Sequence, residues 1–239
     1  EVRFFTPTTE VPICGHATIA AHYVRAKETH MEGGTVVQKT KAGILPVDVV
    51  RTPNDYSITM TQGTPAISAP FGDAVRERIA DALGIAHEEI CREYPVAVAS
   101  TGHSKVMVPI YSNELLHGLQ PDLQKLTKIS KQIECNGYYV FTLNPQNKIL
   151  VHGRMFAPAI GIAEDPVTGN ANGPLGAYLV HFNILQDEDA RCFDFDIMQG
   201  EAIKRDGTMH VHVEKEHGTP KLVQITGNAV IAFSTEITI

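Results

Sequence analysis

Residues 154–171 read RMFAPAIGIAEDPVTGNA, and residues 3–17 read RFFTPTTEVPICGHA. Both stretches contain R-x-F-x-P followed by P-x-x-G-x-A, and a segment rich in small residues comes after each. Self-similarity of this kind is the sequence signature of a repeated architecture. The shared order of the matches predicts a duplicated fold, in which each copy runs from a strand through a turn into a helix. The alternative is that strand–turn–helix units simply recur in α+β proteins.

Hydrophobic periodicity predicts both helices and strands along the chain. Helices are expected at 17–27, 73–83, 122–133 and 172–182; the second stops at Gly84, and the third has one apolar side. The expected strands occupy residues 2–5, 35–39, 44–50, 56–61, 96–100, 105–110, 138–143, 149–156, 192–197, 209–215, 222–226 and 229–234. This mixture predicts an α+β fold.

The composition is that of an ordinary globular protein with room for one large domain or two small ones: 239 residues, 43% hydrophobic and 20% charged. A net charge of −7 and the lack of a lysine and arginine cluster argue against nucleic-acid binding. No apolar run is long enough to span a membrane, and the first residues do not resemble a signal peptide. Four widely spaced cysteines without a CxxC motif indicate a reducing, cytoplasmic location.

Each copy of the repeat leads into a helix N-terminus, where free backbone N–H groups favour an anion. If the copies pack about a pseudo-twofold axis, both helix ends converge on one cleft and hold a carboxylate from two sides. The side chains expected to flank this ligand are Cys14 and His16 in the first copy and Asp165 and Asn170 in the second.

The second copy has a lead-in segment, at about residues 96–150, that has no counterpart ahead of Arg3. Either the copies diverged here, or an N-terminal segment of similar size is missing. The lack of an initiator methionine favours the second explanation.

At these residues the sequence resembles the PhzF-like (phenazine biosynthesis-like) family of the diaminopimelate epimerase fold, and especially its bacterial YddE-type members. The stretches FTPTTEVPICGHATIAAHYVRA, TGHSKVMVPI and GRMFAPAIGIAEDPVTGNANGPLGAYLVHFNIL carry the resemblance. It implies two pseudo-symmetric domains, each a mixed sheet wrapped around a central helix, with the N-terminal one incomplete here. Because the family chain crosses back at its end, it also implies an N-terminal half-domain of residues 1–66 plus 229–239 and a C-terminal domain of residues 67–228.

The resemblance further implies proton transfer at carbon without a cofactor, as in racemisation, epimerisation or double-bond isomerisation. The family's G-H matches Gly15 and His16, and its D-P-x-T-G begins at Asp165. The serine that often follows is Asn170 here, whose amide can still orient a carboxylate. The family's main acid/base glutamate lies upstream of the first motif, so an isomerase that truly lacks this segment is expected to be impaired.

Asp165 is the first candidate acid/base, because burial raises a carboxyl pKa toward neutrality; alternatively it caps a helix. Its neighbour Glu164 is expected to be solvated or structural. His16 is the candidate opposing acid/base or a donor to an enolate; alternatively, backbone hydrogen bonds hold it in the turn. Cys14 is expected to line the cleft, since Thr168 rather than a second cysteine stands in the other copy.

The substrate-binding residues expected around the ligand are Cys14, Gly15, Ala17, Thr168, Gly169 and Asn170. No metal is expected, because His210 and His212 alternate on a strand edge, where histidines are usually solvated. The TGHSK stretch at 101–105 is expected to be a hairpin turn, with substrate contact as the alternative. Cys91, Cys135 and Cys192 are expected to be core or surface residues.

The sequence therefore predicts a cofactor-independent isomerase of racemase or epimerase type, acting on a small anionic metabolite. A homodimer is expected, or else a compensating partner chain, because an incomplete first domain would expose a sheet edge. The alternative is a non-catalytic small-molecule-binding or assembly protein that retains the fold.

Overall fold

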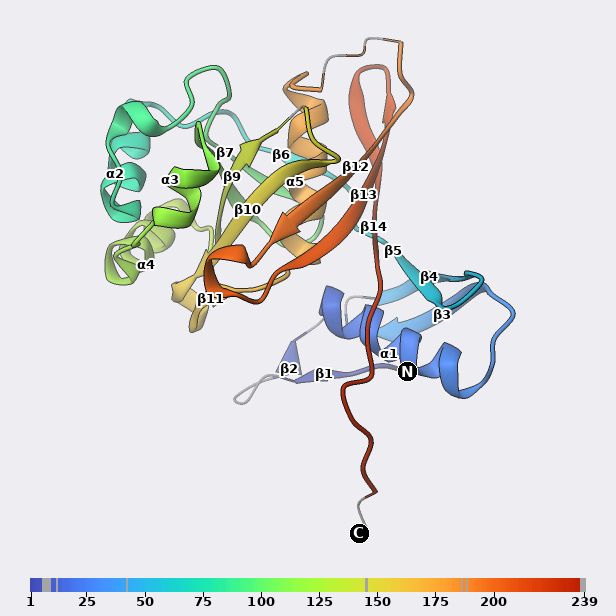
Figure 1. Cartoon of the computed structure of the whole chain (residues 1–239). Helices are drawn as coiled ribbons and strands as arrows, with labels where there is room; N and C mark the ends of the chain where they lie inside the picture. The colour runs from blue at the N-terminus through green and yellow to red at the C-terminus, as the bar shows by residue number, and fades with distance from the viewer. Residues whose placement is uncertain are drawn as a thin grey trace. The chain divides into compact units, whose positions relative to one another are not determined.

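The computed structural model of the chain (Figure 1) describes residues 1–5, 10–11, 13–41, 43–144, 146–185, 187 and 189–236. The chain divides into two compact units, Glu1–Thr61 with Thr226–Ile239 and Gln62–Ile225. Both units contain strands and helices, which confirms the expected α+β class. Two prolines of the expected repeat, Pro7 and Pro12, lie outside the described residues.

The first unit consists of a short hairpin, one helix and three longer strands. They are β1 (Phe4–Phe5), β2 (Glu10–Val11), α1 (Gly15–Glu28), β3 (Gly34–Thr40), β4 (Gly43–Arg51) and β5 (Tyr56–Thr61). The strands β3, β4 and β5 pair antiparallel in chain order, and α1 packs on β4 and β5. Every second residue of β5 is buried, as expected for a strand that presents one face to a helix.

The second unit is built on a mixed sheet. Its elements are β6 (Ala66–Ile67), α2 (Asp73–Leu83), η1 (His87–Glu89), β7 (Ala97–Ser100), β8 (Lys105–Pro109), α3 (Asn113–Gly118), α4 (Leu123–Ile133), β9 (Tyr138–Leu143), β10 (Ile149–Ala157), η2 (Pro158–Ile160), β11 (Ile162–Asp165), α5 (Gly169–His181), β12 (Cys192–Gln199), η3 (Glu201–Ile203), β13 (Gly207–Glu216) and β14 (Thr219–Gly227). The strand order is β14-β13-β12-β10-β9-β8-β7-β6, with β11 on β10. The pairs β8–β9 and β10–β12 are parallel.

Helices cover both faces of this sheet: α2, α3 and α4 lie on one side and α5 on the other (Figure 1). The α2–α4 side is a hydrophobic cluster that includes Val106, Tyr138 and Phe156. On the α5 side, the ring of Phe141 meets Tyr178 edge-on, with their centroids 5.8 Å apart. Burial from both sides explains why β8 and β9 are almost continuously apolar rather than alternating.

The strand pairing of the two hairpins reflects the internal repeat. In the first unit β1 pairs with β2 so that Phe4 lies opposite Val11. In the second unit β10 pairs with β11 so that Met155 lies opposite Asp165. The sequence repeat makes Phe4 equivalent to Met155 and Val11 equivalent to Asp165, so the two hairpins share this pair. Beyond it the second hairpin departs from the first, because its register shifts between Met155 and Ala157.

A bidentate ion pair closes each of these hairpins. Arg3 donates to both carboxylate oxygens of Glu10, at 3.0 Å each. Arg154 donates likewise to Glu164, at 2.9 and 2.7 Å. The two guanidinium groups lie 5.0 Å from the ring centroids of Phe5 and Phe156, which are also equivalent in the repeat. Glu164 is therefore structural, one of the two roles expected for it.

The C-terminal strand expected at 229–234 is absent: residues 228–236 form no helix or strand. Val230 and Phe233 are 86% and 81% exposed. The apolar run at 229–233 is typical of a strand, but a strand also needs a hydrogen-bonded neighbour. No such neighbour for this segment is found in the described part of the chain.

The helix expected at 172–182 begins three residues earlier, at Gly169. Pro174 therefore lies inside α5 rather than close to its start. Because proline has no N–H, the carbonyl group of Asn170 lacks its usual helical partner. The short elements β6, β11 and α3 were not expected from periodicity, since each contains six residues or fewer.

Candidate active site

The first predicted loop forms the N-terminus of α1. Cys14 is the N-cap residue, Gly15 begins the helix, and His16 and Ala17 follow in the first turn. The thiol of Cys14 lies 3.5 Å from Nε2 and 3.8 Å from Nδ1 of His16. The Thr18 hydroxyl donates to the Cys14 carbonyl oxygen at 2.8 Å, which fixes the turn. An exposed imidazole beside a half-buried thiol is thus placed at a helix start.

The second predicted loop forms the N-terminus of α5. Thr168 is the N-cap residue, and Gly169 and Asn170 begin the helix. Asp165, the last residue of β11, accepts a short hydrogen bond at Oδ2 from the Thr168 hydroxyl. The carboxylate is half-buried and does not cap the helix, because its hydrogen bond goes to a side chain rather than to backbone N–H groups. This geometry differs from the capping alternative for Asp165.

The starts of α1 and α5 differ from those of two other helices in the chain. The side chain of Ser112 caps α3, and that of Asp122 caps α4. Neither α1 nor α5 has a side-chain cap or an acidic residue in its first turn. Within the described residues, the N–H groups of Gly169 and Asn170 have no hydrogen-bond partner. The start of α5 is therefore suited to an external anion.

Gln199 is hydrogen-bonded to this loop, although the sequence pattern predicted no role for it at the site. The strand β10 changes neighbours along one edge: Gly153 pairs with Gln199 of β12, and Met155 pairs with Asp165 of β11. The ends of β11 and β12 therefore lie side by side. The Gln199 amide donates to the Asp165 carbonyl oxygen at 2.6 Å and to the Thr168 hydroxyl at 3.0 Å.

The other end of the Gln199 amide accepts two hydrogen bonds. These come from the Thr168 backbone N–H at 3.2 Å and from the Asn172 side chain at 3.0 Å. Gln199 is 1% exposed and Asn172 is fully buried. The Tyr139 hydroxyl lies beside Asn172, outside hydrogen-bond geometry, and burial raises the pKa of Tyr139. A buried polar network of Gln199 and Asn172 therefore holds the loop from Asp165 to Thr168 in place.

Lys105 is a second residue whose placement the sequence did not reveal. The expected hairpin is present, since β7 and β8 pair antiparallel, but Lys105 is only 3% exposed. Within the described residues its ammonium group makes one hydrogen bond, to the Ser104 carbonyl oxygen at 3.0 Å, and no ion pair. Burial lowers the pKa of Lys105, although Cys135 and Asp165 raise it. A costly buried cation therefore lies close to Asp165.

The sequence profile of the phenazine biosynthesis-like protein family (PhzC-PhzF) matches residues 1–235. The chain belongs to this family. It is 54% identical over 237 residues to an uncharacterised isomerase of Clostridium acetobutylicum and 48% identical over 235 residues to the uncharacterised isomerase YddE of Escherichia coli. These alignments cover 99% and 98% of this chain and 78% of each relative.

A more distant PhzF-family relative has a name that states its reaction. It is the trans-2,3-dihydro-3-hydroxyanthranilate isomerase of Pseudomonas fluorescens, 27% identical over 231 residues, which cover 96% of this chain and 76% of that protein. Among solved structures, the PhzF-family phenazine biosynthesis protein of Bacillus anthracis matches with a TM-score of 0.86 and 30% identity. That match covers 99% of this chain and 80% of the Bacillus chain and supports the diaminopimelate epimerase-like fold.

The two histidines that were expected to be solvated make cross-strand ion pairs in this PhzF-family chain. His210 lies between Asp196 and Asp194, at 2.9 and 3.1 Å, and His212 pairs with Asp194 at 2.8 Å. No group of three or more His, Cys, Asp or Glu side chains among the described residues has a geometry that could hold a metal ion. None of the helices in the described part of the chain is both long and apolar enough to cross a membrane.

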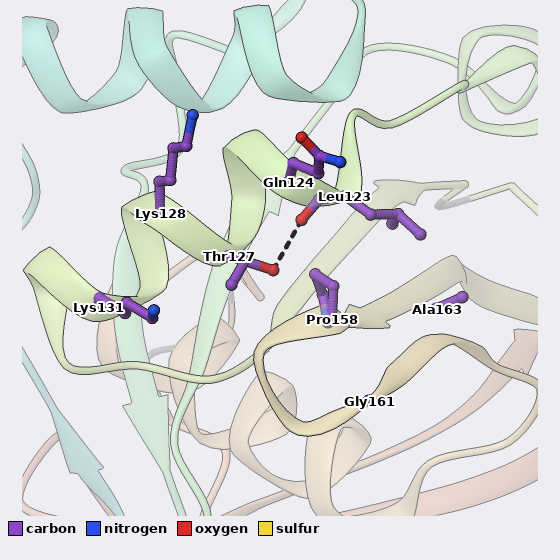
Figure 2. A pocket seen from close by; sticks show the side chains of 8 residues that line it. All are labelled: Leu123, Gln124, Thr127, Lys128, Lys131, Pro158, Gly161 and Ala163. Carbon is purple, nitrogen blue, oxygen red and sulfur yellow. Dashed lines mark hydrogen bonds between the residues drawn. The ribbon is translucent and has the colours of Figure 1, made fainter.

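A shallow groove of about 510 Å³ lies between α4 and the η2–β11 turn (Figure 2). Its lining is made up of Leu123, Gln124, Thr127, Lys128, Lys131, Pro158, Gly161 and Ala163. None of the site residues predicted from the PhzF-like motifs lines this groove. The structure instead gathers those residues around two helix starts, one in each unit.

Proposed function

We propose that this chain is an isomerase that transfers a proton at carbon on a small carboxylate-bearing metabolite, without a cofactor. The observation that carries the proposal is the Asp165 carboxylate at the uncapped start of α5, with Oδ2 hydrogen-bonded and Oδ1 open. Membership of a family whose relatives are named isomerases supports the reaction class.

In this proposal, the reaction takes place at the start of α5. The backbone N–H groups of Gly169 and Asn170 hold the substrate carboxylate, because helix starts favour negative charge. Asp165 exchanges a proton with the reacting carbon. His16 is the candidate second acid/base, and Cys14, Gly15 and Ala17 are further candidate substrate-binding residues.

The test is isotope exchange. The protein is incubated in heavy water with trans-2,3-dihydro-3-hydroxyanthranilate and with a panel of amino and hydroxy acids, and deuterium at the α-carbon and isomer formation are followed by NMR and mass spectrometry. At least one compound is expected to take up label. Asp165→Asn, which keeps the shape of the side chain, should lower the exchange rate at least a hundredfold without changing the melting temperature.

Asp81→Asn is the matched control, because Asp81 is a surface carboxylate that pairs with Lys125 of α4. This variant should exchange at the unaltered rate. Undiminished exchange in Asp165→Asn would remove Asp165 from the mechanism. Binding of a panel member without any label uptake would favour the alternative, a small-molecule-binding protein that retains the fold.

A further inference from the structure

The orientation of the Gln199 side chain is fixed by backbone groups. One end of its amide faces the Asp165 carbonyl oxygen at 2.6 Å, and the other end faces the Thr168 N–H at 3.2 Å. A carbonyl oxygen can only accept and an N–H can only donate, so the amide nitrogen must face Asp165. A flipped amide would place oxygen against oxygen and N–H against N–H.

The amide orientation decides the direction of the next hydrogen bond. The Gln199 amide nitrogen also donates to the Thr168 hydroxyl oxygen at 3.0 Å. A hydroxyl group has one proton, and that proton is then left for Oδ2 of Asp165. Donation therefore runs in one direction, from amide to hydroxyl to carboxylate. Oδ1 of Asp165 has no hydrogen-bond partner among the described residues.

We propose that Gln199 and Thr168 are positioning residues that make Oδ1 of Asp165 the atom that exchanges the proton. This rests on the proposed function. In the step, the substrate C–H bond breaks, an O–H bond forms at Oδ1, and the electron pair stays on the substrate as a carbanion or enolate. The Thr168 hydroxyl keeps its own proton throughout and donates it in a hydrogen bond to Oδ2, since the Gln199 amide N–H occupies the acceptor side of the hydroxyl.

Burial makes this arrangement robust. Gln199 is 1% and Thr168 8% exposed, so bulk water does not readily compete for their hydrogen bonds. The second acceptor bond of Gln199, from the buried Asn172 side chain at 3.0 Å, holds the amide against rotation. Asn172 in turn donates to the Thr168 carbonyl oxygen at 3.0 Å, so the network is closed around the helix start.

The test is the carbon-13 NMR shift of the Asp165 carboxyl group on aspartate-labelled protein, with Asp165→Asn used to assign the resonance. Thr168→Val removes the hydroxyl and keeps the shape, whereas Thr168→Ser keeps the hydroxyl. The carboxyl resonance should move in Thr168→Val, because the hydrogen bond from the hydroxyl to Oδ2 is lost. In Thr168→Ser the resonance should match that of the unaltered protein.

Gln199→Glu provides a second measurement, because a carboxylate would accept the Thr168 proton and turn it away from Asp165. It should also move the Asp165 carboxyl resonance. Lys105 on β8, which interacts electrostatically with Asp165, and the Arg154–Glu164 pair on β10 and β11 are the same in all variants. Equal carboxyl shifts in Thr168→Val and Thr168→Ser, in variants whose amide spectra show an intact fold, would overturn the assignment of Oδ1.

This NMR measurement needs no substrate, so its outcome is separate from that of the isotope-exchange test. With a compound that exchanges, Thr168→Val should lower kcat about tenfold with little change in KM, and Thr168→Ser should restore kcat. An unchanged kcat in Thr168→Val would also overturn the inference, even if the protein proves to be an isomerase.

Discussion

The ion pair between Arg154 and Glu164 should be among the most costly polar interactions to break in the second unit. Its side chains are 8% and 13% exposed. Removing one member of a buried pair leaves an uncompensated charge and costs about 3–5 kcal/mol of unfolding free energy. The repeat supplies an internal comparison, because the equivalent Arg3–Glu10 pair has the same bidentate geometry but an Arg3 side chain that is 58% exposed.

The expected losses of unfolding free energy differ between the variants. Glu164→Gln leaves a guanidinium group that still donates to the Leu116 and Leu119 carbonyl oxygens at 3.0 Å, so a loss of about 3 kcal/mol is expected. Arg154→Met leaves both carbonyl groups and the carboxylate without a donor, so the loss should approach about 5 kcal/mol. Arg3→Met should change stability little, because solvent and salt screen an exposed pair.

Urea unfolding followed by circular dichroism measures these differences, and amide hydrogen exchange in β10 separates the second unit from the first. The double variant Arg154→Met with Glu164→Leu should recover most of the loss, because a well-packed apolar pair avoids the desolvation of two charges. Equal destabilisation by Arg154→Met and Arg3→Met would refute the reasoning that burial, rather than bidentate geometry, sets the magnitude.

Two further predictions concern pH. Burial lowers the pKa of Lys105, so between the folded-state pKa and the ordinary one near 10.4 the unfolded chain binds more protons, and the free energy of unfolding rises with pH. Lys105→Met should abolish this rise and be at least as stable as the unaltered protein at pH 7. Urea unfolding at pH 7 and 10 that shows the same rise in both proteins would contradict this prediction. Burial alone would lower the pKa of His210, but hydrogen bonds to Asp196 and Asp194 raise it. The contribution of His210 to stability is therefore present below about pH 6.5 and is lost as pH rises through the folded-state pKa. In the same assay, His210→Asn should lose up to about 1 kcal/mol of unfolding free energy at pH 5.5 and nothing at pH 8.5, with His217→Asn as an exposed control.

Elements with strong local signals were predictable from the sequence. The helix at 73–83 was correct at both ends, because Gly84 adopts the left-handed conformation that ends helices. The repeat predicted two matching strand–turn–helix units, and it placed Asp165, Thr168, Gly169 and Asn170 around one helix start. These residues are consecutive or nearly so, and hence local sequence suffices to gather them.

Features that depend on distant partners were not predictable. Gln199 reaches Asp165 because β11 and β12 succeed one another along β10, a register that no local pattern encodes. Lys105 follows four turn residues and resembles a solvated side chain, yet it is buried on the sheet. The segment at 229–234 was wrongly predicted as a strand because its apolar run is a local signal, whereas the pairing of a strand requires another segment.

The repeat also separates the framework of each loop from its chemical groups. In both copies a side chain one turn into the helix, Thr18 or Asn172, donates to the carbonyl oxygen of the N-cap residue. The side chains of the N-cap residue and of the second helical residue have diverged, with Cys14 and His16 in one copy and Thr168 and Asn170 in the other. Combinatorial libraries at these four positions could therefore explore new substrate preferences, while the ion pairs of Arg3 and Arg154 maintain the conformation of each hairpin.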